Sequence, residues 1–161
     1  MFLVLLLAWV MVPSGNCLSP NADFSGTWKQ SNERSTPART GNVTLHIDHR
    51  DPDMTVETTI LRGSATPRHA LQHYTTDGKT STSTGADGDE FRTSVAWSGQ
   101  GLVFSVEEHE DGRIILSRET WTLIENGAAL ERCRERNGAP QGDQGRAGKQ
   151  TIIYRREAPK P

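Results

Sequence analysis

Apolar and polar residues alternate along short runs of the chain beyond residue 23. The alternation is clearest in Val43–Asp48 and Phe91–Trp97, where it places the apolar side chains on one face of a strand. Gly, Asn, Asp and Pro residues separate the runs at nearly regular intervals. No window longer than about eight residues keeps the 3.6-residue period of a helix. The pattern therefore predicts an all-β domain built from consecutive antiparallel hairpins.

We expect about ten strands. Their predicted ranges are 24–31, 42–49, 53–62, 69–76, 79–84, 90–97, 101–109, 113–124, 128–136 and 149–156. Consecutive hairpins leave two open edges unless the sheet closes, so we predict a single up-and-down β-barrel of about 8–10 strands. Two polar segments, 32–41 and 137–148, fall outside the pattern and are expected to be a link and a loop at a barrel mouth.

The N-terminus has a different composition from the rest of the chain. Met1–Val12 is an unbroken apolar run, and it is too short to cross a hydrocarbon layer of about 30 Å as a helix. It predicts a signal peptide. The predicted divisions are 1–22 for the signal peptide and a short linker, 23–157 for the barrel and 158–161 for a flexible tail. Cleavage after Ser14 or at a later site before Asp23 would give a secreted or periplasmic protein without a transmembrane span. Lipid anchoring through Cys17 is the alternative, disfavoured because Asn16 stands where a small residue is expected.

Charge and composition reduce the number of functions and partners that are possible for this chain. The 18 Lys and Arg residues nearly balance the 20 Asp and Glu residues, so no general positive field is available to hold nucleic acid. Hydrophobic residues make up only 34% of the chain, which predicts a barrel with a partly polar, hydrated interior. A small hydrophobic or amphipathic molecule is the expected partner.

The sequence favours a non-catalytic protein but leaves the question of enzyme activity open. It contains no Gly-x-Ser-x-Gly elbow and no Gly-rich loop for phosphate. His69 and His73 would lie on one side of a strand, roughly 13 Å apart, which is too far for both to bind one metal ion. We therefore predict no catalytic residue, no metal and no cofactor.

Three segments carry a resemblance to a known superfamily. The run Phe24-Ser25-Gly26-Thr27-Trp28-Lys29 resembles the opening strand of the calycin superfamily, in which lipocalins carry Gly-x-Trp and fatty-acid-binding proteins carry Phe-x-Gly-Thr-Trp. Tyr74–Lys79 and Thr120–Leu123 are similar to segments of small secreted bacterial lipocalin-like proteins. The resemblance implies an exported lipocalin-like barrel that binds or carries a small, partly apolar ligand.

The first strand also suggests a structural signature. With a period of two, Gly26 and Trp28 share a face, so the indole can close one end of the barrel. The lipocalin resemblance implies that a basic residue near the last strand packs across this tryptophan. Arg155 or Arg156 is placed to do so, and we take Arg155 as the signature residue.

The chain departs from the fatty-acid-binding proteins at two places. These proteins have a two-helix lid between the first two strands, for which the link 32–41 is too short. Their Arg-x-Tyr clamp on the last strand is absent, because Ile152 stands two positions before Tyr154. The second lipocalin motif, Thr-Asp-Tyr, is also missing. The resemblance therefore carries no fatty-acid site over to this chain.

Large apolar side chains on predicted inward faces are the candidates for core and cavity. These are Phe91, Val95, Trp97, Leu102, Phe104, Val106, Trp121 and Leu123. Among the chain's large side chains, we predict that Phe104, Trp121 and Tyr74 reach a ligand.

The segment 128–136 places Arg132, Arg134 and Arg136 on one face of a strand. Facing inward, these arginines could clamp an anionic ligand, with Arg134 the best candidate. Facing water, they would form ion pairs with acidic side chains of neighbouring strands, namely Glu107, Glu108 or Glu119. The sequence favours the solvated face.

A second function remains open. In this alternative the barrel is filled and acts as a structural or interaction module of the cell envelope, presenting loops such as 137–148 to a protein or polysaccharide. The interior distinguishes the two hypotheses, because a ligand carrier needs a cavity of roughly 300 Å³ or more.

Overall fold

The computed structural model describes residues 21–38, 41–84, 88–110, 112–137 and 148–158. The predicted signal peptide through residue 20 lies outside these residues, as do Cys17, the loop interior at 138–147 and the end of the tail. Within the described part of the chain, no helix is long and apolar enough to span a membrane.

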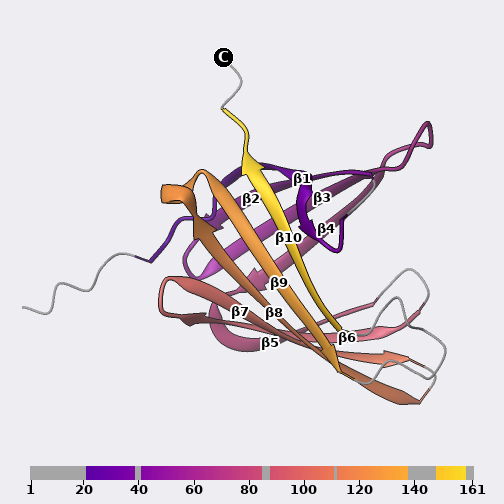
Figure 1. Ribbon diagram of the computed structural model, residues 1–161. Helices are drawn as coiled ribbons and strands as arrows, with labels where there is room; N and C mark the ends of the chain where they lie inside the picture. Colours follow the sequence, from indigo (N-terminus) through magenta and orange to yellow (C-terminus); the bar gives the residue numbers. More distant parts are fainter. Residues whose placement is uncertain (1–20, 39–40, 85–87, 111, 138–147, 159–161) are drawn as a thin grey trace, which may run out of the picture.

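The described chain is all-β, as predicted, and contains one short 3-10 helix. The elements are β1 (Gly26–Thr36), β2 (Asn42–Arg50), β3 (Asp53–Leu61), β4 (Arg68–Thr75), β5 (Asp77–Thr84), β6 (Glu90–Ser98), β7 (Gly101–Glu110), β8 (Arg113–Ile124), η1 (Glu125–Gly127), β9 (Ala129–Asn137) and β10 (Gly148–Arg156). The ten strands form one antiparallel sheet in the order β4-β3-β2-β1-β10-β9-β8-β7-β6-β5. Because β1 pairs with β10, the sheet curves into a nearly closed barrel (Figure 1).

Strand β1 is longer than predicted. The segment 32–41 was expected to be a link, but β1 continues to Thr36 with a register shift between Ser31 and Thr36. Ser35 lies in this irregular segment, and its hydroxyl accepts a hydrogen bond from the Ile153 backbone N–H at 3.2 Å. The same hydroxyl donates to the Ser31 carbonyl at 2.7 Å. The Ser35 hydroxyl thus ties the irregular part of β1 to the backbone of β10.

One end of the barrel is tightly packed. Phe24 and Trp28 have no exposed surface, and the Trp28 indole N–H donates to the Phe24 carbonyl at 2.9 Å. The Phe24 ring centroid lies 6.0 Å from that of Trp97 and 6.4 Å from that of Trp121. Aromatic side chains bury large areas, so this cluster supplies much of the core of a chain with few apolar residues. We call this region the packed end.

Arg156 packs across Trp28, so the choice of Arg155 as signature residue is wrong. Trp28 lies directly opposite Arg156 in the β1–β10 register, whereas Arg155 lies opposite Lys29 and points to the other face. The Arg156 guanidinium carbon lies 4.3 Å from the Trp28 ring centroid. Gly26 has a φ of +131°, and a Cβ there would lie 3.3 Å from Arg156 Nη1. The glycine therefore serves both the backbone conformation and the space for the arginine.

Candidate ligand-binding cavity

A cavity of about 780 Å³ lies inside the barrel beyond the packed end. Strands β2 to β10 contribute to its walls. Phe24 and Trp28 of the packed end do not line the cavity, and Trp121 lies at the boundary between the two regions. The volume lies within the range of small-molecule sites. The barrel is therefore hollow, and the filled interior on which the interaction-module alternative rested is absent from the described structure.

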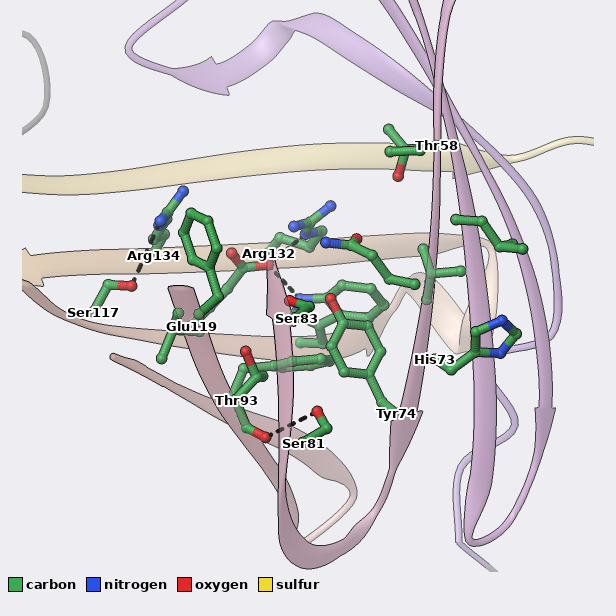
Figure 2. A pocket seen from close by; sticks show the side chains of 18 of the residues that line it. Thr58, His73, Tyr74, Ser81, Ser83, Thr93, Ser117, Glu119, Arg132 and Arg134 are labelled. Carbon is green, nitrogen blue, oxygen red and sulfur yellow. Dashed lines mark hydrogen bonds and ion pairs between the residues drawn. The ribbon is translucent and has the colours of Figure 1, made fainter. Parts of the chain in front are cut away.

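An aromatic wall forms one side of the cavity. The Tyr74 and Phe104 ring centroids are 5.3 Å apart with the rings nearly perpendicular, and those of Phe104 and Trp121 are 4.6 Å apart. Figure 2 shows the Tyr74 ring projecting from β4 into the middle of the cavity. Burial raises the pKa of Tyr74 to about 12. Its hydroxyl therefore stays protonated and can donate a hydrogen bond to a ligand.

The ion pair between Arg132 and Glu119, which has no net charge, lies beside the aromatic wall. Arg132 Nε lies 2.6 Å from Glu119 Oε1, and the Trp121 indole N–H donates to the same carboxylate. Burial alone would raise the pKa of Glu119, but the attraction of Arg132, the hydrogen bonds from Arg132 and Trp121 and the attraction of Arg134 together hold that pKa below its usual value. The Arg132 guanidinium also stacks 4.5 Å from the centre of the Trp121 ring. Both charges are therefore well partnered within the barrel.

Arg134 has a different environment. Its guanidinium lies 3.5 Å from the Ser117 hydroxyl, which is a long hydrogen bond, and no carboxylate of the described residues lies within ion-pair distance (Figure 2). The next arginine along the strand, Arg136, is paired with Glu108 at 2.7 Å. Glu119 lies opposite Arg134 in the β8–β9 register and attracts it, but the carboxylate is bonded to Arg132. Arg132 and Arg134 thus share one carboxylate, which leaves a net positive charge in the cavity wall, next to the hydroxyl of Ser117 and within the same cavity as that of Tyr74.

The prediction of a solvated arginine face is wrong, although two of its proposed ion-pair partners are correct. Arg132 and Arg134 line the cavity. Leu130 shares their face of β9 and is fully buried, so the whole face turns inward with it. Glu119 also turns inward, because it has the same parity on β8 as the buried Trp121. The arginines meet Glu119 and Glu108, as the alternative predicted, but inside the barrel.

All four residues predicted to contact a ligand, Tyr74, Phe104, Trp121 and Arg134, line this cavity. Their role in binding stays a prediction. Sequence reasoning did not select Arg132, Glu119 or Tyr154, which line it too. For Arg132 and Glu119 the available signal was the alternation of the strand, which places them on the same faces as the apolar Leu130 and Trp121.

The histidines of β4 bond to threonines of the neighbouring strand. His69 Nδ1 and His73 Nδ1 each lie 3.1 Å from a threonine hydroxyl of β3, those of Thr59 and Thr55. Over the described ranges, no three His, Cys, Asp or Glu side chains converge in a way that could hold a metal ion.

Known structures share this architecture. Lipid binding protein 8 of Caenorhabditis elegans has a TM-score of 0.61 and 11% identity, covering 83% of this chain and 95% of that chain. The fluorescent protein UnaG has a TM-score of 0.58 and 20% identity over 83% and 97%. Fatty-acid-binding protein 1 of Echinococcus granulosus has a TM-score of 0.56 and 11% identity over 84% and 98%. No protein-family model and no curated protein sequence matches the chain.

At these identities the likeness establishes the fold. The structure has the β-barrel fold of these fatty-acid-binding proteins and related barrels, which agrees with the fold that the resemblance of the first strand implied. It differs from the fatty-acid-binding pattern where the sequence indicated: β1 and β2 are joined by residues 37–41, without room for a helical lid.

Proposed function

We propose that this protein is an exported, non-catalytic barrel that binds a small amphipathic molecule with an anionic end, most simply a carboxylate. The observation that carries the proposal is Arg134, whose guanidinium faces a cavity of about 780 Å³ without a carboxylate partner among the described residues. Arg134 is half-buried and shares the single carboxylate of Glu119 with Arg132, so a ligand anion that pairs with Arg134 would balance the net positive charge and gain affinity.

The rest of the cavity supports an apolar body for the ligand. Phe104 and Trp121 offer ring surface, and Val56 and Ile60 of β3 add aliphatic surface. The neighbouring structures include proteins whose names refer to lipid or fatty-acid binding, which agrees with a carrier for such molecules. The proposed anion-binding groups are Arg134 of β9 and Ser117 of β8. They differ from the fatty-acid-binding proteins, whose clamp is an Arg-x-Tyr pair on the last strand.

Equilibrium binding of a saturated fatty acid and of the corresponding alcohol tests the anion site. A charge-assisted hydrogen bond contributes about 1.5–3 kcal/mol, so we expect the acid to bind at least tenfold more tightly than the alcohol. Arg134→Gln should remove most of this preference, while Arg118→Gln on the exposed outer face of β8 should keep it. Equal affinity of acid and alcohol for the unmodified protein, or no binding of either, would overturn the proposal.

Export is tested separately by the N-terminus of the mature protein. Expression of the full chain in a bacterial host, followed by cell fractionation and mass spectrometry, should give a protein outside the cytoplasm. Its first residue should lie between positions 15 and 23. A cytoplasmic protein that retains Met1–Val12 would contradict export, and a lipidated Cys17 would contradict release.

A further inference from the structure

Strands β4 and β5 follow each other in the chain but do not pair. They stand at the two ends of the sheet order, and within the described residues no backbone ladder joins them. The chain turns between them at Thr76, which is held by hydrogen bonds from its N–H to the Pro52 carbonyl at 2.8 Å and from its hydroxyl to Asp51. From this fixed corner the β3–β4 and β5–β6 hairpins diverge (Figure 1).

The cavity extends into the gap between these two edges. Along paired strands only alternate residues line it, as Val56, Thr58 and Ile60 do on β3. Along the two edge strands consecutive residues line it, through Leu71–Tyr74 on β4 and Ser81–Thr84 on β5. Successive side chains of a strand point to opposite faces, so a cavity that touches both faces must pass around the strand edge. The barrel therefore has a lateral slot between β4 and β5.

The slot is polar. The facing edges of β4 and β5 carry backbone N–H and C=O groups without partners in the sheet, as edge strands do. The β5 side adds the hydroxyls of Thr82, Ser83 and Thr84, and Figure 2 shows Ser83 beside the cavity. An apolar chain placed here would cover unpaired polar groups at a cost in free energy. A ligand group that forms hydrogen bonds would satisfy them.

The slot lies across the barrel from the anion site. Strands β9 and β10 occupy the middle of the sheet order, and the slot lies between its two ends, so Arg134 on β9 and the slot are on opposite walls. A barrel of ten strands spaced about 4.8 Å apart and tilted by about 40° is roughly 20 Å across between backbones. An elongated molecule can therefore reach both walls at once.

We propose that the slot is a second binding subsite and that the ligands of this protein have two polar ends. The anionic end pairs with Arg134, and a neutral hydrogen-bonding group at the far end, a hydroxyl or an amide, lies between the edges of β4 and β5. The inference rests on the proposed function, because it needs the carboxylate at Arg134 to orient the ligand. It adds a substrate class, chains with a hydroxyl or amide at the end away from the carboxylate, that the anion site alone does not require.

A series of saturated fatty acids of increasing chain length, each compared with its ω-hydroxy derivative, tests the subsite by equilibrium binding. A terminal hydroxyl weakens binding where the chain ends in an apolar pocket. Here it should strengthen binding about fivefold or more at the best chain length, corresponding to roughly one hydrogen bond. Thr82→Trp, which places a large side chain at the slot, should abolish the preference for the ω-hydroxy acid over its parent acid, measured as the ratio of the two affinities. Ser105→Trp on the exposed outer face of β7 is the control and should leave this ratio unchanged.

The outcomes separate the two proposals. No binding of any parent acid by the unmodified protein would overturn the proposed function, and the subsite with it. Binding of the parent acids with an ω-hydroxyl penalty at every chain length would overturn the subsite alone. A hydroxyl preference that survives in Thr82→Trp would place the second polar contact elsewhere and would also overturn it. If Thr82→Trp does not fold, Ser83→Val serves the same comparison, with a reduced hydroxyl preference as the expected result.

Discussion

The packed end and the hollow half of this barrel are built from the same ten strands with very different side chains. At the packed end, inward positions hold Phe24, Trp28 and Leu130, all without exposed surface. In the hollow half, the next inward positions of β9 are Arg132 and Arg134. A chain with few apolar residues can therefore concentrate its hydrophobic core at one end of the barrel. The other end can then contain charges and space, which a binding site needs and a stable core does not.

The largest effect is expected from breaking the packed end. Trp28→Ala should lower the free energy of unfolding by about 3–5 kcal/mol, because it removes a large buried aromatic and leaves a cavity. It also takes away the ring on which Arg156 stacks. Urea titration followed by circular dichroism measures the change. Leu71→Ala is the control, since Leu71 is 61% exposed and should change stability by less than about 0.5 kcal/mol. A loss below about 1 kcal/mol for Trp28→Ala would show that this end does not hold the barrel together.

In the hollow half, the buried ion pair should be the most sensitive element. Arg132→Met should destabilise the protein by about 3 kcal/mol, because Glu119 then loses the guanidinium that bonds to it and keeps only the unbonded Arg134 opposite it. The double variant Arg132→Met/Glu119→Gln should recover a large part of the loss, since neither charge remains. Chemical unfolding of both variants checks this. If the double variant is as unstable as the single one, the packing of Arg132 on Trp121 outweighs its charge.

Arg134 should behave in the opposite way. Without ligand, Arg134→Met should raise the free energy of unfolding by about 0.5–1 kcal/mol, because it removes the net positive charge of two arginines that share one carboxylate. The same substitution at Arg118, on the solvated outer face, should leave stability within about 0.5 kcal/mol. Thermal unfolding of the ligand-free proteins measures the difference. A clear loss of stability in Arg134→Met would mean that the guanidinium contributes to the stability of the fold and is not available to pair with a ligand.

The smallest effect concerns pH and His49, which is buried near Phe24 and Trp97 at the packed end. Burial lowers the pKa of His49, against the opposing attraction of Asp51 and Asp23. In the unfolded chain the imidazole gains its proton near pH 6.5, so the unfolded state binds more protons below that pH. His49 therefore favours unfolding as the pH falls from about 6.5 towards its lowered value in the fold, and this effect stops growing below that value.

Unfolding free energies between about pH 5 and 7.5 test this. His49→Phe should flatten the dependence of stability on pH in the acid part of this range, whatever its effect on stability at neutral pH. The matched control is His46→Gln, which removes an exposed imidazole from the outer face of β2. Equal slopes for the two variants would assign the acid sensitivity to other groups.

The local alternation of apolar and polar residues was sufficient to predict the strands and to separate the side chains on their two faces. The alternation in Val43–Asp48 and Phe91–Trp97 predicted strands that the structure contains as β2 and β6, because a side-chain period of two is a local property of the backbone. The predicted cavity residues Phe104, Trp121 and Tyr74 reached the interior for the same reason. The motif around Gly26 and Trp28 indicated the calycin-type barrel.

Which face of each strand lies inside the barrel, and how neighbouring strands are aligned, depended on contacts between segments that are distant in the sequence. The alternation of β9 separated its arginines from its glutamates, but the burial of Leu130 against other strands turned the arginines inward. The choice between Arg155 and Arg156 depended on the β1–β10 register, which joins residues more than a hundred positions apart. The slot between β4 and β5 depended on where the sheet fails to close. Register and closure arise from contacts between distant segments, and a local pattern of residues does not encode them.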